Sequence, residues 1–129
     1  MNGAAHLILY VAEQERSARF YSAALGIAPR LDVPGMTEFD LPGGAVLGLM
    51  PEAGIRRLLG DALPDPAGAS GIARAELYLV VPDAGVAHAR ALAAGASELS
   101  RLCWRDWGHL VAYSSDPDGH VLAFAQPPH

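Results

Sequence analysis

The feature that most constrains this sequence is a repeat, because one order of elements occurs twice along the chain. In the first half, apolar residues alternate over residues 6–11, which predicts a strand with Leu7, Leu9 and Val11 on one side. His6, Ile8 and Tyr10 then lie on the other side. Helical spacing follows over residues 13–25, where Gly26 can end the helix. Three further strands are predicted, near residues 29–33, 37–41 and 45–50.

The second half repeats this order. A strand is predicted over 76–81, an Ala-rich helix over 84–94, and strands near 97–102, 109–114 and 120–125. The turn Pro117-Asp118-Gly119 takes the place that Pro42-Gly43-Gly44 holds in the first half. The predicted fold class is therefore α+β, with two tandem βαβββ modules forming a cupped mixed sheet.

The predicted boundaries make one domain of residues 1–129. Module one covers about residues 4–50 and module two about residues 74–126. The segment between them, 51–73, is rich in Pro and Gly and is interpreted as a linker, with a short helical turn at 55–59. An isolated small sheet exposes an apolar face, so each module is expected to need its twin.

Composition excludes several classes of function. A chain of 129 residues suits one domain, and its formal charge of -5 opposes binding to nucleic acid. No apolar run is long enough to span a bilayer, and no signal peptide is recognised at the N-terminus, so a cytoplasmic location without membrane association is expected. The lone Cys103 suits a reducing compartment and is interpreted as structural.

Two stretches of the chain carry a family resemblance. In the first half it is His6 to Val11, followed by a helix with the pairs Phe20-Tyr21 and Leu25-Gly26. In the second half it is the stretch from Trp107-Gly108-His109 through Asp116-Pro117-Asp118-Gly119. The chain resembles the vicinal oxygen chelate superfamily, which includes glyoxalases, extradiol dioxygenases and bleomycin- or fosfomycin-resistance proteins.

The resemblance implies four metal-ligand positions in metal-dependent members, at the first and last strands of each half. In this sequence they hold His6, Gly48, Glu76 and Ala123. Gly48 and Ala123 have no donor atom, whereas an open catalytic site needs about three protein ligands. No metal cofactor is therefore predicted. If a divalent metal binds, His6 and Glu76 are its expected ligands, with His109, Glu38 or Asp40 as substitute donors.

The alternation of the strands predicts which side chains line the cup. His6, Ile8 and Tyr10 share a face in the first strand, as do Glu76 and Tyr78 in the fifth. Trp104 and Trp107 are placed in a loop, where exposed aromatic rings often mark a binding site. The predicted ligand-binding residues are thus His6, Ile8, Tyr10, Met50, Glu76, Tyr78, Trp104, Trp107 and Tyr113. This lining suits a medium-sized amphipathic or aromatic molecule.

Other polar residues are given structural roles. Asp116 and Asp118 flank a proline in a turn that needs local hydrogen bonds, so they are interpreted as turn residues and not as an acid–base pair. His88 is expected to be a solvated helix residue. The catalytic residues, if any exist, are left unassigned.

Three functional interpretations stay open. The first is a metal-free small-molecule-binding protein of the bleomycin-resistance type, which sequesters a drug or metabolite and so confers antibiotic resistance. The second is a metal-dependent glyoxalase-like lyase or isomerase, or an extradiol-type dioxygenase, that uses substitute ligands. The third is a cofactor-free enzyme with His6 or Glu76 as general base. A homodimer is expected in each case, and the sequence does not decide whether the protein is an enzyme.

Overall fold

The structure is a computed structural model that describes residues 3–69 and 71–128. Its internal contacts divide these residues into two compact units, formed by residues 3–22 with 27–69 and by residues 23–26 with 71–128. Each unit holds one four-stranded mixed sheet. The predicted α+β fold with two βαβββ modules is confirmed.

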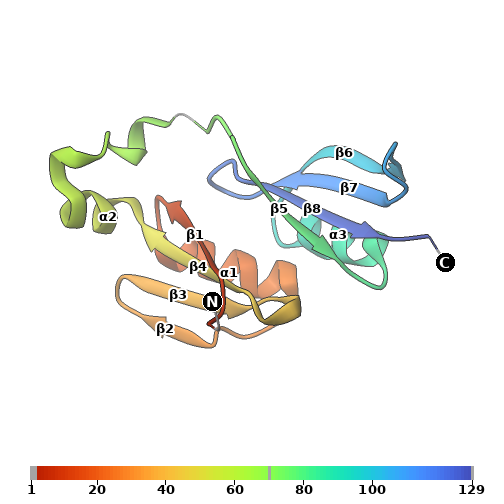
Figure 1. The fold of residues 1–129 in the computed structure, drawn as a ribbon, viewed down its shortest axis with the longest axis horizontal. Helices are drawn as coiled ribbons and strands as arrows, with labels where there is room; N and C mark the ends of the chain where they lie inside the picture. The colour runs from red at the N-terminus through yellow and green to blue at the C-terminus, as the bar shows by residue number, and fades with distance from the viewer. Residues whose placement is uncertain (1–2, 70, 129) are drawn as a thin grey trace. The chain divides into compact units, whose positions relative to one another are not determined.

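The sheet of module one has the strand order β1-β4-β3-β2 (Figure 1). Its β1 strand pairs in parallel with β4, and the other neighbours are antiparallel. Two helices and three short 3-10 turns complete the unit. The elements are β1 His6–Val11, α1 Gln14–Leu25, β2 Leu31–Val33, β3 Met36–Asp40, η1 Pro42–Gly44, β4 Val46–Pro51, α2 Glu52–Leu59, η2 Gly60–Ala62 and η3 Pro66–Ala69.

One face of this sheet forms the core of module one. Thr37, Phe39, Leu47 and Leu49 are fully buried on it. The side chain of Gln14 fixes the start of α1 there, because its Nε2 donates to the Oγ1 of Thr37 at 2.9 Å and to the Val33 carbonyl at 2.8 Å. The opposite face, which carries His6, Ile8 and Tyr10, is more exposed.

The sheet of module two repeats this topology, with the strand order β5-β8-β7-β6. The strand β5 pairs in parallel with β8, and the others are antiparallel. The helix α3 contacts β6, β7 and β8 (Figure 1). Asp83 caps this helix by accepting a hydrogen bond from the Val86 amide at 3.0 Å. The elements are β5 Glu76–Val80, α3 Ala84–Ala93, β6 Ser97–Trp104, β7 Leu110–Ser115 and β8 Val121–Gln126.

Three local expectations need correction. The turn expected at 55–59 is part of the longer helix α2, in which Ile55 is buried. His88 is not solvated: it is 6% exposed, and its Nε2 lies 2.9 Å from Glu98 Oε2. Trp104 lies not in a loop but at the end of β6. The helical pattern located the helix that carries His88, but the burial of His88 depends on its partner Glu98 on the neighbouring strand β6.

The structural role of Asp116 agrees with its contacts. This side chain is 5% exposed, and its Oδ1 accepts hydrogen bonds from the amides of Asp118 at 2.9 Å and His120 at 2.8 Å. The carboxylate thereby holds the turn that leads into β8. Among the described residues, no helix is long and apolar enough to cross a membrane.

Candidate functional site

Module one brings four of the predicted site residues onto one face of its sheet, called here the open face of module one. Pairing between β1 and β4 sets His6 opposite Val46, Ile8 opposite Gly48, and Tyr10 opposite Met50. Ile8 is 40% and Tyr10 36% exposed. His6, Ile8, Tyr10 and Met50 are therefore neighbours with apolar surface available on this face.

The histidine of this face lies beside a cluster of charged side chains. His6 Nδ1 lies 3.5 Å from Glu38 Oε2, and the other oxygen of Glu38 lies 3.6 Å from Arg30 Nε. Arg30 also donates from Nη1 to Asp40 Oδ1 at 3.1 Å. The two carboxylates named as substitute metal donors, Glu38 and Asp40, are thus both paired with one guanidinium. A divalent cation would have to compete with that guanidinium for both carboxylates.

Gly48 is closely covered on the same face. A Cβ at this position would lie 3.1 Å from Cγ1 of Ile8 and 3.2 Å from the sulfur of Met36. These two side chains converge over the glycine, so they fill the space into which a side chain at residue 48 would project. Apolar packing thus fills the position at which the family resemblance implies a metal ligand.

Module two presents a comparable face, called here the open face of module two. Tyr78, Ala123 and Tyr113 are direct cross-strand neighbours on β5, β8 and β7. Both tyrosines pack against a buried cluster that contains Ala123 together with Val111 and Ala125. Small residues on the central strands therefore form a floor, and aromatic rings lie above it. Glu76 lies on the same face by strand alternation.

A hydrogen-bonded network crosses this face. The hydroxyl of Tyr78 lies 2.6 Å from His109 Nδ1, and the Trp107 Nε1–H donates to the same hydroxyl at 2.9 Å. The rings of Tyr78 and His109 are stacked, with centroids 5.9 Å apart. Trp107 is 56% exposed although its polar atom is bonded, so its ring surface is held in a fixed orientation facing solvent.

Arg105 lies beside this network. Its guanidinium carbon is 5.1 Å from the centre of the Tyr113 ring, a cation–π distance. Burial raises the pKa of the Tyr113 phenol, the charge of Glu76 raises it further, and Arg105 acts in the opposite direction. Tyr113 therefore stays neutral through the physiological range and keeps its hydroxyl hydrogen.

The raised pKa of Tyr113 predicts a loss of stability in alkali. A phenol whose folded pKa lies above the unfolded value stabilises the protein fully below that unfolded value of 10.0, and this contribution disappears as pH rises through the folded pKa. Tyr113→Phe is expected to make the decline in unfolding free energy above pH 10 shallower. Urea denaturation between pH 8 and pH 11 measures how the free energy of unfolding changes with pH in both proteins. Parallel curves for the variant and the unmodified protein would contradict the expectation.

Trp104 does not join the other predicted site residues. It pairs with Leu110, whereas the preceding Cys103 pairs with Val111 of the open face. Since adjacent residues on a strand point to opposite faces, Trp104 projects away from Tyr78 and Tyr113. Trp104 is 60% exposed, on the face of the sheet against which α3 packs. The structure thus brings Glu76, Tyr78, Tyr113 and Trp107 together and leaves Trp104 apart.

Sequence reasoning gave no site role to three residues of these faces. Arg105 was noticeable only by its position between two tryptophans, and Arg30 and Met36 gave no signal. Arg30 pairs with Glu38 and Asp40 because all three lie at the same end of neighbouring strands. Such a cluster depends on the β2–β3 register, in which Leu31 faces Glu38, and this register was not predicted.

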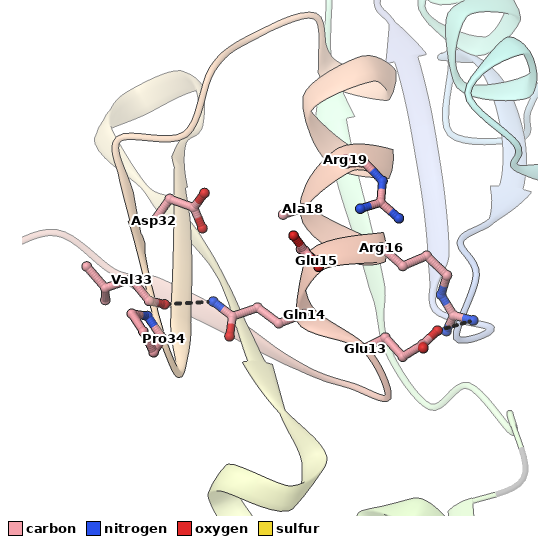
Figure 2. Close-up of a pocket in the computed structure, with 9 residues that line it drawn as sticks. All are labelled: Glu13, Gln14, Glu15, Arg16, Ala18, Arg19, Asp32, Val33 and Pro34. Carbon is pink, nitrogen blue, oxygen red and sulfur yellow. Dashed lines mark hydrogen bonds and ion pairs between the residues drawn. The ribbon is translucent and has the colours of Figure 1, made fainter.

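Module one also has an open groove of about 820 Å³ between the first turns of α1 and the loop after β2. Figure 2 shows Gln14 pointing across it to the Val33 carbonyl, while Arg16 is turned toward Glu13. Its lining mixes both signs of charge: Glu13, Gln14, Glu15, Arg16, Ala18, Arg19, Asp32, Val33 and Pro34. None of the predicted site residues lines this groove.

Metal-ligating residues do not gather in the described part of the chain. Residues 3–69 and 71–128 contain no group of three or more His, Cys, Asp or Glu side chains placed to hold a metal ion. The four positions that the resemblance implies hold two residues without donors, and His6 is already paired with Glu38. The residues present do not fit the metal centre of the metal-dependent members.

The fold and these faces define a class of protein built from two βαβββ modules. A family model for the Glyoxalase/Bleomycin resistance protein/Dioxygenase superfamily matches residues 3–124. The chain belongs to this superfamily. No curated protein matches the chain.

Solved structures from the same superfamily are similar over nearly the whole chain. A glyoxalase-related enzyme from Fulvimarina pelagi is 26% identical with a TM-score of 0.82, covering 99% of this chain and 90% of the other. A glyoxalase/bleomycin resistance protein/dioxygenase from Nocardioides is 23% identical with a TM-score of 0.72, covering 98% and 83%. A family enzyme from Burkholderia phytofirmans PsJN has a TM-score of 0.82 at 15% identity, covering 98% and 99%. The last two show the fold alone.

Proposed function

We propose that this protein binds a small amphipathic or aromatic molecule on the open faces of its sheets, without a catalytic divalent metal. The observation that carries the proposal is the aromatic surface of module two. Tyr78 and Tyr113 lie over the buried floor of Val111, Ala123 and Ala125, and Trp107 exposes its ring beside them. A flat apolar ligand gains contact area there, and the bonded hydroxyl and indole groups fix its orientation.

The metal-free part of the proposal rests on the residues at the family's ligand positions. Ile8 and Met36 fill the space above Gly48, and Ala123 is part of the apolar floor. Glu38 is paired with Arg30, and its other carboxylate oxygen lies 3.5 Å from His6 Nδ1. These side chains form the wall of a binding surface more readily than a coordination sphere.

Sequestration requires affinity and no reaction, so this function does not need a nucleophile or an activated base. The family name includes bleomycin resistance, and binding of a drug would be one form of such sequestration. A homodimer in the cytoplasm completes the proposal, since two copies of the chain would double the number of binding faces. Whether the protein is also an enzyme is left to the test.

The test is binding of a flat aromatic probe with and without metal. The reference probe is 2-naphthol, and the readout is the indole N–H signal of Trp107 in ¹⁵N NMR, which Trp104→Phe assigns because the chain has only two tryptophans. We expect a saturable shift of that signal that is unchanged by EDTA or by added Zn²⁺, Ni²⁺, Mn²⁺, Fe²⁺ or Co²⁺. Metal content of untagged protein, measured in parallel, should lie well below one ion per chain.

Two results would overturn the proposal. A tightly bound metal near one ion per chain, lost in His6→Gln, would establish the metal-dependent alternative and direct assays to glyoxalase and dioxygenase reactions. Failure of every aromatic probe to shift the Trp107 signal would remove the ligand-binding surface. Leu58→Ser, which changes an exposed residue of α2 in the segment that follows β4, serves as a control that should leave probe binding unaltered.

A further inference from the structure

The network on the open face of module two has more donor hydrogens than it uses. Trp107 and Tyr78 each contribute one, and a neutral His109 contributes one more. The two hydrogen bonds between these groups use two of the three. Whichever way the protons are arranged, one hydrogen is left over, either on the Tyr78 hydroxyl or on His109 Nε2. A protonated imidazole leaves two.

Arg105 has unused donors as well. Its Nη2 donates to Ser100 Oγ, the Arg101 carbonyl and the Val111 carbonyl, each at 2.9 Å, and its Nε donates to the Val111 carbonyl at 3.3 Å. These bonds fix the guanidinium against β6 and β7. Its Nη1 has no partner among the described residues, so both of its N–H groups are available to a ligand.

These two sets of donors come from residues that face each other. The Arg105 amide donates to the His109 carbonyl at 2.9 Å, so the two residues flank the turn between β6 and β7 as a cross-strand pair. Arg105 follows Trp104, which projects to the helix-covered face, and His109 precedes Leu110, which pairs with Trp104. By alternation, both side chains project to the open face.

We propose that Arg105 and His109 form an anion-recognition site, and that the ligand of this protein is an aromatic molecule with a carboxylate group. The inference rests on the proposed function, because the ring of that ligand would lie on the Tyr78, Tyr113 and Trp107 surface. The fixed guanidinium keeps the two N–H groups of Nη1, which point in different directions, so each of them can give a charge-assisted hydrogen bond to a carboxylate oxygen. The leftover hydrogen of the Tyr78–His109 pair adds a donor from the other side of the turn.

Two negative charges lie near this site, and the charge of Glu76 acts on the Tyr113 phenol in the opposite direction to that of Arg105. Asp106 lies in the same turn and Glu76 on the same face, but neither makes an ion pair with Arg105 in the described part of the chain. The formal charge of -5 belongs to the whole chain, and any charge more than about 10 Å from the site is largely screened at 0.1 M salt. The proposed anion site therefore depends on the local donors of Arg105 and of the Tyr78–His109 pair.

The experiment compares two probes with the same ring system, 2-naphthoate and 2-naphthamide, by the shift of the Trp107 indole signal. The unmodified protein should bind the carboxylate about tenfold more tightly, the size of effect expected for hydrogen bonds to a charged group. Arg105→Met should abolish this preference while the amide still binds. Arg101→Met is the matched control, since it removes the same charge from an exposed neighbour on β6.

Each outcome has a distinct meaning. Equal affinity of the two probes in the unmodified protein would overturn the anion site and leave the proposed function standing. Failure of both probes to bind would overturn the anion site and the proposed function together. The comparison in the unmodified protein needs no variant, so it decides the matter even if Arg105→Met does not fold. Loss of the preference in Arg101→Met would show a general charge effect and also overturn the site.

Discussion

Replacing Gly119 by alanine is expected to lower the free energy of unfolding by about 3 kcal/mol, because two separate costs add at this position. The first is conformational: φ is +89°, a region that a residue with a Cβ rarely adopts. The second is steric: the new Cβ would lie 3.1 Å from the Gly71 carbonyl oxygen and 3.2 Å from its Cα. Both neighbours are backbone atoms, so neither can turn away as a side chain could. Urea denaturation measures the loss.

Gly108→Ala separates the two costs. This glycine has φ of +90°, and its amide donates to the carbonyl three residues earlier, as that of Gly119 does. Nothing lies within 4 Å of its would-be Cβ. Gly108→Ala is therefore expected to lower the free energy of unfolding by the conformational cost alone, about 1–2 kcal/mol. Equal losses in the two variants would mean that the Gly71 segment moves aside freely and that its contact with the β8 turn stabilises nothing.

The repeat made the fold predictable from the sequence. Period-two alternation placed His6, Ile8 and Tyr10 on one face, and the register between β1 and β4 agrees with it. Turn chemistry placed Asp116 and Gly119 just before β8, where they are found. These signals are local, because each depends only on residues near one another in the chain.

Features that depend on strand register were not predictable in the same way. His88 is buried because Glu98, ten residues further along the chain, lies against it and bonds its ring. Trp104 has the exposure of a loop residue, yet its pairing with Leu110 turns it away from the other aromatic rings. One residue of register reverses the face of every side chain on a strand. Composition and periodicity do not fix that register.

In the candidate site, too, some features could be predicted from the sequence and others required the structure. Sequence comparison between the two halves identified Gly48 and Ala123 as residues without donor atoms. What takes the place of a donor required the structure: two apolar side chains over Gly48, and two tyrosines over Ala123. The unused donors of Arg105 became visible only when its other hydrogen bonds could be counted. A residue without a donor atom is thus visible in a sequence, whereas the side chains that surround it are not.

A pair of truncations on opposite faces of the module-two sheet should give very different results. Phe124 is 2% exposed and faces α3, so Phe124→Ala is expected to lower the free energy of unfolding by about 3–5 kcal/mol through lost burial and the cavity left behind. Val80 on the neighbouring strand is 50% exposed on the open face, and Val80→Ala should cost less than about 1 kcal/mol. Denaturant unfolding of both variants checks this contrast.

The contrast bears on function because it separates what holds the module together from what is available to a ligand. If Val80→Ala is nearly neutral for stability, the apolar surface of the open face is not needed for folding. It can then be covered by a ligand without rearrangement of the core. If Val80→Ala proves as costly as Phe124→Ala, the open face is part of the core of the folded protein, and a ligand could reach its floor only by displacing the residues that cover it.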